Sequence, residues 1–255
     1  MLANYHTHTT LCGHAVGDER EYVENAIKAG IKILGFADHS PQIFTDGFVS
    51  SIRMRPDQTP AYVEKIRRLG EEYKQDITLY VGFEVEYFPA FFPALRDFGR
   101  ELGVDYFIMG QHYLFHEKGG VWVALPDPDE KRLTDYVDQV LEGLATGAFT
   151  YLAHPDMINY TGDEAHFRTE MTRLCQGAKA LDVPLEVNML GLADHRHYPS
   201  ERFYRIAAEV GNEIIVGCDA HNPAALLDVE SQKKTRAFAE QFGLHVMDTV
   251  PFRKL

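Results

Sequence analysis

Residues 214–222 read IIVGCDAHN, an apolar run that ends in an aspartate and a histidine. Isoleucine and valine are enriched in strands, and a short continuous run of them is typical of a strand inside a parallel sheet. Asp219 and His221 stand two positions apart, so their side chains point the same way along an extended chain. The stretch therefore predicts a strand whose end offers two side chains to one metal ion.

The same arrangement recurs along the chain. Apolar runs predict strands at Leu2–His8, Ile31–Asp38, Ile77–Glu86, Asp105–His112, Phe149–His154, Pro184–Met189 and Glu213–Asp219. Amphipathic stretches between them predict helices at about 18–29, 59–74, 93–102, 129–146, 163–181, 200–210 and 223–242. Residues 244–250 form either a last short strand or extended cover.

These strand–helix units follow one another without a linker, which predicts a single α/β domain over residues 1–255. A closed or nearly closed parallel (β/α) barrel of the TIM type suits this number of units. The alternative is an open, doubly wound sheet. The Gly-x-Gly-x-x-Gly fingerprint of a dinucleotide site and the phosphate-binding P-loop are both absent, which favours the barrel.

Polar residues that can bind metal stand at the ends of these predicted strands. In a (β/α) barrel the carboxyl ends of all strands open on one face, so residues far apart in sequence form one cluster there. Imidazole and carboxylate groups suit zinc, manganese or iron, and this many ligands predicts two or three ions. Glu84 and Glu86 share one face, and we favour Glu84 as the ligand. The strand-end candidates are His6, His8, Asp38, His39, Glu84, Glu86, His112, His154, Asp156, Glu186, Asn188, Asp219 and His221.

Composition narrows the classes of partner. The formal net charge of −13 disfavours binding to nucleic acid or an anionic membrane, which needs a basic face. No apolar stretch is long enough to span a bilayer, and the first residues do not resemble a signal peptide. Three scattered cysteines without a Cys-x-x-Cys pair suggest a reducing cytoplasm and no disulfide framework. No obligate protein partner is evident.

The strand ends, read in order, resemble a known family. HTH (6–8), His14, ADHS (37–40), GFEVE (82–86), GQHY (110–113), AHPD (153–156) and CDAH (218–221) are similar to the motifs of the polymerase and histidinol phosphatase (PHP) superfamily. The openings HTHTTLCGHA and GFADHSP most resemble its monofunctional histidinol-phosphate phosphatases. The resemblance implies a distorted (β/α)7 barrel with its active site at the carboxyl ends of the strands.

The resemblance also implies three divalent ions, usually zinc, manganese or iron. The first would be held by His6, His8, Glu84 and Asp219, the second by Glu84, His112 and His154, and the third by His14, His39 and His221. The implied reaction is hydrolysis of L-histidinol phosphate to L-histidinol and phosphate in histidine biosynthesis. A hydroxide that bridges two ions would attack, because metal binding lowers the pKa of water from 15.7 to about 7. The cations would also let an acidic chain accept a phosphate.

Groups that bind the substrate are predicted from the loops at the same rim. Arg196 is the first candidate for the phosphate and Arg53 the second, since a guanidinium fork fits phosphate oxygens. His197 is a candidate proton donor to the leaving alcohol. Glu86, Asp156 and Glu186 are unranked candidates for the substrate amine or imidazole. Residues 41–58 and 113–128, the latter with Phe115 and Trp122, are long enough to shape the pocket.

Other functions are also compatible with parts of this sequence pattern. A PHP phosphoesterase that acts on another small phosphate or a nucleotide would share every motif. A polymerase-associated exonuclease is disfavoured by the lack of a basic groove. A metal-dependent amidohydrolase would usually bring a lysine at a strand end, and a non-catalytic metal-binding protein would be marked by lost ligands; the sequence shows neither feature.

Overall fold

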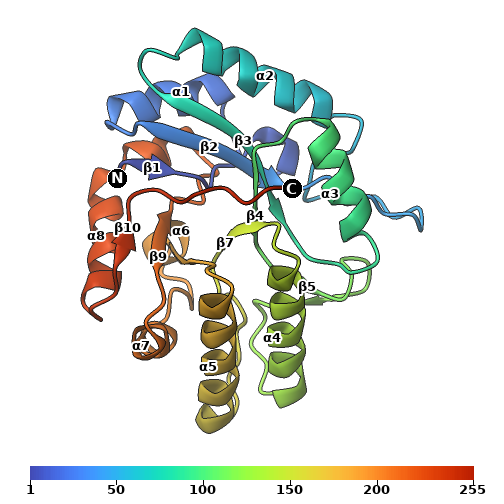
Figure 1. The fold of residues 1–255 in the computed structure, drawn as a ribbon, viewed down its shortest axis with the longest axis vertical. Coiled ribbons are helices and arrows are strands. Elements are labelled where there is room, and N and C mark those ends of the chain that lie inside the picture. The colour runs from blue at the N-terminus through green and yellow to red at the C-terminus, as the bar shows by residue number, and fades with distance from the viewer.

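The computed structural model describes residues 1–255 and contains one curled, parallel eight-stranded sheet with helices outside it (Figure 1). Each strand hydrogen-bonds to its neighbours in the order β1-β2-β3-β4-β7-β8-β9-β10. The strands are β1 (Ala3–Asn4), β2 (Ile33–His39), β3 (Thr78–Val85), β4 (Tyr106–Met109), β7 (Phe149–Leu152), β8 (Leu185–Asn188), β9 (Ile214–Gly217) and β10 (Val246–Met247). The predicted α/β class and all seven predicted strands are confirmed.

The barrel is distorted where its ends meet. At the carboxyl end, Thr7 forms a parallel bridge with Ala220, where the His8 N–H donates to the Ala220 carbonyl at 3.0 Å. At the amino end, β10 pairs with β9 through Val246 opposite Ile214. The seven strands that carry the barrel therefore close beside the residues that follow β1 and β9. Of the two alternatives left open for residues 244–250, the structure shows the short strand, β10.

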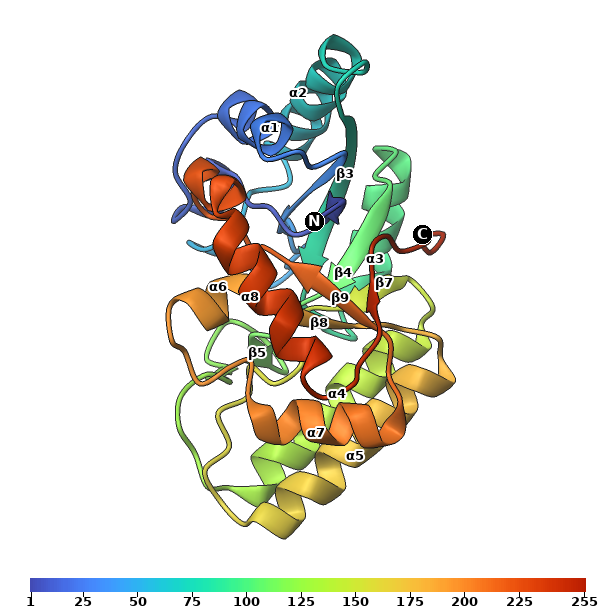
Figure 2. The ribbon, with the colours of Figure 1, turned by 90° about the vertical axis from the view of Figure 1, so that its left-hand side faces the viewer.

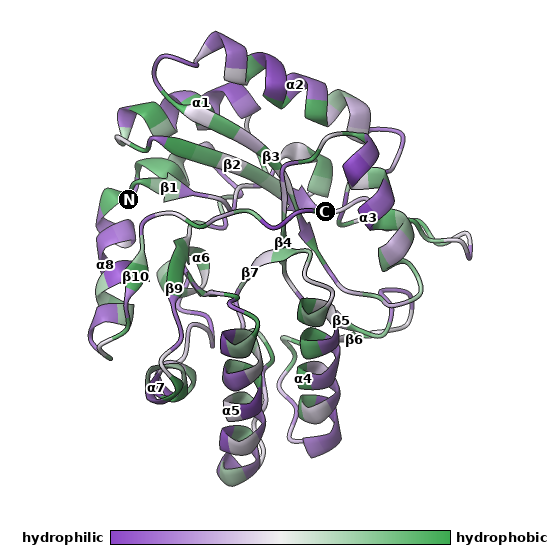
Figure 3. Cartoon of the chain, in the orientation of Figure 1, coloured by the Kyte–Doolittle hydropathy of each residue, from purple (hydrophilic) through white to green (hydrophobic).

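Helices cover the outside of the sheet, as Figures 1 and 2 show from two directions. They are α1 (Glu19–Lys28), α2 (Thr59–Glu72), α3 (Phe92–Glu101), α4 (Glu130–Ala145), α5 (Glu164–Ala180), α7 (Glu201–Val210) and α8 (Val229–Glu240). Aspartates cap several of them; Asp163, for example, accepts a hydrogen bond from the His166 N–H at 2.8 Å at the start of α5. Figure 3 shows that α4 and α5 alternate hydrophobic and hydrophilic residues, as helices with one buried face should. None of the helices is long and apolar enough to cross a lipid bilayer.

Four local elements were not predicted. The five-residue helix α6 (Met189–Ala193) follows β8 directly. The predicted helix at 223–242 is split into a 3₁₀ turn, Pro223–Leu227, and α8. The 113–128 segment contains an antiparallel hairpin, β5 (Tyr113–Leu114) and β6 (Val121–Trp122), and a further 3₁₀ turn covers Thr10–Cys12.

The inside of the barrel is filled at its amino end by buried tyrosines. Tyr5, Tyr106 and Tyr151 belong to a small inner cluster that is separate from the larger core between sheet and helices. Phe252, in the tail that crosses the barrel in Figure 1, stacks on Tyr106 with ring centroids 4.6 Å apart. Because this end is packed with side chains, the interior is open only at the carboxyl end of the strands.

Candidate metal and phosphate site

A cavity of about 660 Å³ opens at the carboxyl ends of the strands. Seven of the nine residues that the family resemblance implies as ligands line it, and His6 and His8, which are fully buried, contact the lining residues Glu84 and Asp219. The structure thus brings all nine into one cluster. The lining members of the set are His14, His39, Glu84, His112, His154, Asp219 and His221.

Glu84 lies at the centre of this cluster. Its Oε1 is 2.7 Å from His154 Nε2 and 3.4 Å from His112 Nε2, and its Oε2 is 2.9 Å from His39 Nδ1. Burial alone would raise the pKa of Glu84, but the surrounding imidazoles, His112 first, hold it well below its usual value. The carboxylate is therefore ionised, and both of its oxygens face imidazole nitrogens.

Glycine makes room for this carboxylate. β4 runs beside β3, and a Cβ at Gly110, just after β4, would overlap the Glu84 carboxylate. The Gly-x-His order at the end of this strand thus leaves room for the Glu84 carboxylate and places His112 beside it.

A first group of possible ligands lies beside Glu84. His8 Nε2 is 3.1 Å from Asp219 Oδ1, and His6 Nε2 is 3.5 Å from the same oxygen. Both Nε2 atoms are buried and have no hydrogen-bond partner. Buried polar atoms without a partner are costly, so nitrogens that converge on two ionised carboxylates fit a divalent cation.

A second group lies nearer the cavity mouth. His14, His39 and His221 place ring nitrogens within 4.8 Å of one another, and His221 Nε2 is 3.1 Å from His14 Nε2. Burial, with the charge of His8, lowers the pKa of His221 to about 3, and burial also lowers the pKa of His39 well below its usual value. Neutral imidazoles are the form that binds metal. Cys12 lies near His8 and His221, but burial raises the pKa of its thiol to about 12, which disfavours the thiolate.

Three further carboxylates lie beside the Nδ1 atoms of imidazoles whose Nε2 faces the cluster, hydrogen-bonded to His6 and His8 and close to His112 without a hydrogen bond. Glu186 Oε1 is 2.8 Å from His6 Nδ1, Asp38 Oδ1 is 3.3 Å from His8 Nδ1, and Glu86 Oε1 is 3.2 Å from His112 Nδ1. Carboxylates in this position fix the tautomer and orientation of a metal-binding histidine. This arrangement distinguishes Glu86, which faces His112 Nδ1, from Glu84, which faces the imidazole Nε2 atoms.

Arg196 lines the cavity as its placement in the loop after β8 suggested. Nη1 donates to the Tyr198 hydroxyl at 3.0 Å and Nη2 donates to Asp194 at 2.9 Å, while the side chain stays 40% exposed. A guanidinium has five N–H donors, so three remain for an anion.

Two other predicted substrate groups are placed elsewhere. Arg53 is buried outside this cavity, where it pairs with Glu86 and donates from Nε to Glu117 at 2.8 Å, so its guanidinium is not free for a phosphate. His197 is absent from the cavity lining, and its Nε2 is bonded to the Met157 carbonyl at 2.7 Å. Burial and Arg196 lower its pKa, which disfavours the protonated form that a proton donor needs.

Sequence reasoning missed part of the cavity wall. The two long segments do shape it, through Ile52 from the first and Tyr113 and Trp122 from the second. Tyr198 and the short helix α6, which contributes Leu190 and is followed by Asp194, were not foreseen. The one signal for α6 is its cap, since Asn188 Oδ1 accepts from the Gly191 N–H at 2.8 Å.

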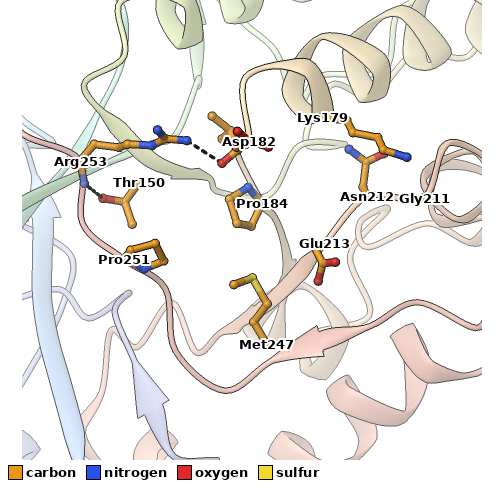
Figure 4. A pocket seen from close by; sticks show the side chains of 11 residues that line it. Thr150, Lys179, Asp182, Pro184, Gly211, Asn212, Glu213, Met247, Pro251 and Arg253 are labelled. Atoms are coloured by element: carbon orange, nitrogen blue, oxygen red, sulfur yellow. Dashed lines mark hydrogen bonds between the residues drawn. The ribbon is translucent and has the colours of Figure 1, made fainter.

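A second cavity, of about 390 Å³, lies at the opposite, amino end of β7, β8 and β9 (Figure 4). Its two cations are already bonded to main-chain carbonyls: Arg253 Nη2 donates to Asp182 O at 2.7 Å, and Lys179 Nζ donates to Val210 O at 2.6 Å. No histidine lines this cavity, so the cluster at the carboxyl end is the candidate functional site.

Comparison with known proteins agrees with this fold. The family model for the PHP domain matches residues 4–189. The "Probable histidinol-phosphatase" of Deinococcus radiodurans is 29% identical over 239 residues, which cover 87% of each chain. The "Histidinol-phosphatase" of Bacillus subtilis is 30% identical over 115 residues, 43% of each chain.

A solved structure shares the whole fold. The histidinol phosphate phosphatase of Lactococcus lactis, crystallised with zinc, L-histidinol and phosphate, superimposes with a TM-score of 0.75 at 19% identity and covers 98% of both chains. This likeness establishes the arrangement of the elements.

Proposed function

The chain belongs to the PHP domain family, and we propose that it is a metal-dependent phosphomonoesterase that hydrolyses L-histidinol phosphate to L-histidinol and phosphate. The observation that carries the proposal is the cluster of buried imidazole nitrogens, unpartnered in His6 and His8, around Glu84 and Asp219. Relatives described as histidinol-phosphatases, one of them matched over 87% of its length, support the substrate.

Three ions suit the donor set. Groups of donor atoms within 4.8 Å of one another include His6 with His8 and Asp219, His14 with His39 and His221, and Glu84 with His6 and His154. We assign Glu84 to the first and second ions together, with His112 completing the second. The choice of imidazole and carboxylate donors is compatible with zinc, manganese or iron. Divalent ions held by these residues would supply Lewis acidity, which lowers the pKa of bound water and offsets the charge of phosphoryl oxygens.

The protein's own groups bind and orient the substrate. Arg196 directs its three free N–H groups to the phosphate, while its bonds to Asp194 and Tyr198 fix the plane of the guanidinium. Because the Tyr198 hydroxyl accepts from Arg196, its own O–H remains free to donate to a phosphoryl oxygen. Trp122 and Tyr113 provide an aromatic wall of a size that suits an imidazole ring.

A phosphate-release assay tests the substrate. Protein loaded with zinc, manganese or iron is assayed with L-histidinol phosphate, p-nitrophenyl phosphate and a nucleoside monophosphate. We expect kcat/KM for L-histidinol phosphate to be at least about 100-fold higher than for the other two. Equal turnover of all three would overturn the substrate assignment and favour a phosphoesterase for other small phosphates. Full activity with fewer than two ions per chain would overturn the multinuclear site.

A further inference from the structure

The proposed substrate carries a positive charge as well as a phosphate, because the amine of L-histidinol phosphate is protonated near neutral pH. A protonated amine is bound best by a carboxylate that still has a free lone pair and reaches the cavity. If the proposed function holds, one carboxylate at the cavity surface should bind this amine.

Two of the three carboxylates expected from the sequence, Glu86 and Glu186, are already engaged. Glu86 is paired with Arg53 and accepts from the His112 and Tyr113 N–H groups, each at 2.9 Å. Glu186 is fully buried against His6 and Asn188. None of the three lines the cavity.

Asp156 is absent from the cavity lining. It is 3% exposed and accepts from the Ser200 N–H at 2.6 Å. Because Ser200 ends the loop that follows α6, this hydrogen bond supports that loop.

The cavity has one carboxylate outside the proposed ligand set, Asp194. Asp194 follows α6, which Asn188 caps over the end of β8, so the sheet fixes where this side chain stands. The carboxylate is 51% exposed, and its one ion-pair partner is Arg196 Nη2, at 2.9 Å. A carboxylate has about four lone-pair sites, so most of its capacity as an acceptor is free.

We propose that Asp194 binds the ammonium group of the substrate and is the residue that selects for an amine-bearing phosphate. Asp194 and Arg196 then form a matched pair at the rim, in which Arg196 takes the phosphate and Asp194 the amine. The dense histidine cluster and the aromatic wall offer no other free acceptor with a negative charge on the cavity surface.

The rival explanation is that Asp194 merely holds Arg196 in place, and substrate comparison separates the two. Asp194→Asn keeps the shape and can still accept from Arg196, but it removes the charge. The variant is assayed with L-histidinol phosphate, with the deamino analogue 3-(imidazol-4-yl)propyl phosphate, and with p-nitrophenyl phosphate.

We expect KM for L-histidinol phosphate to rise about 5- to 20-fold, with the two phosphates that lack the amine changed less than about twofold. Product binding gives a readout without turnover: L-histidinol should raise the melting temperature of the wild-type protein and raise that of Asp194→Asn much less. Asp182→Asn, an exposed carboxylate at the opposite end of the barrel, is the matched control and should leave all constants unchanged.

An equal loss with all three substrates would show that Asp194 acts through Arg196 and would overturn the proposal. Retention by Asp194→Asn of the wild-type preference for the amine would also overturn it, with the proposed function intact. If the wild-type protein itself showed no preference for L-histidinol phosphate over the deamino analogue, the proposed substrate would fail instead.

Discussion

Replacing Arg53 by methionine should damage both the stability of the protein and its metal site. The Arg53 and Glu86 side chains are each 1% exposed and the Glu117 side chain is 7% exposed, so one guanidinium is the shared ion-pair partner of two buried carboxylates. Burial disfavours a charged guanidinium, but Glu86 and then Glu117 raise the pKa of Arg53 above its usual value, so it stays charged. Methionine fills much of the same volume without a charge.

The cost follows from the burial of these carboxylates. Breaking a buried ion pair by removing one partner costs about 3–5 kcal/mol. In a chain of this size each kcal/mol shifts the melting temperature by roughly 2–4 °C. We therefore expect Arg53→Met to lower the melting temperature by about 6–20 °C, measured on metal-free protein.

The metal site should weaken for a separate reason. Glu86 uses Oε1 to accept from the His112 and Tyr113 N–H groups, and this oxygen lies beside His112 Nδ1. Removal of a group that orients a metal-binding histidine typically lowers metal affinity by about 10- to 100-fold. A calorimetric titration with metal measures this loss of metal affinity independently of activity.

Two control variants keep the test informative if Arg53→Met folds poorly. Arg53→Lys retains the charge but not the fork that reaches Glu86 and Glu117 together, so both losses should be intermediate. Adding Glu117→Gln to Arg53→Met removes one stranded charge and should restore part of the melting temperature without restoring metal affinity. A melting temperature within about 2 °C of wild type, with unchanged metal affinity, would refute the role of the cluster.

Three further predictions concern the metal cluster. Glu84→Gln should abolish tight metal binding and lower kcat/KM by at least about 100-fold with the far-UV circular dichroism spectrum unchanged, because it removes the charge between the imidazoles; retained metal content would contradict this. Gly110→Ala should displace the Glu84 carboxylate and lower metal occupancy, whereas Gly70→Ala, whose Cβ would meet Leu79 at an ordinary 3.6 Å, should leave occupancy unchanged in elemental analysis. Chelation should lower the melting temperature, and re-addition of metal should restore it. At a free metal concentration of 100 times Kd, the bound metal should add about 2.7 kcal/mol to the free energy of unfolding. A melting temperature that does not change with metal would argue against a metal site in the folded protein.

The sheet and the location of the site could be predicted because both depend on local patterns. A buried strand needs an apolar run, and the residue at which that run ends can be identified without knowledge of the rest of the chain. α6 was missed because five residues that start directly from a strand carry too little periodicity to mark a helix. The assignment of individual residues as metal ligands stays a prediction, although the structure brings the predicted set together.

The roles of particular carboxylates and arginines depend on partners distant in sequence. Glu84 and Glu86 stand two positions apart on one face, and their roles differ because Gly110 leaves space beside Glu84 and Arg53 pairs with Glu86. From the sequence, Arg53 is an arginine in a loop. Only the structure shows that Glu117, 64 positions away, lies beside it and accepts a hydrogen bond from it. Sequence spacing can therefore place such residues at the site but cannot assign their contacts.

The acidic groups of the site fall into two sets with separate consequences. Glu84 and Asp219 face the proposed ions, and Glu186 and Glu86 orient the histidines, so a change in any of them should affect hydrolysis of every phosphate ester. Asp194 stands on the rim, and its side chain is bonded to Arg196 and to none of the proposed metal ligands. The charge of Asp194 can therefore change without disturbing the cluster. Selection of the substrate is then separable from the hydrolytic chemistry, and relatives with other substrates should differ after α6 while keeping the same strand-end cluster.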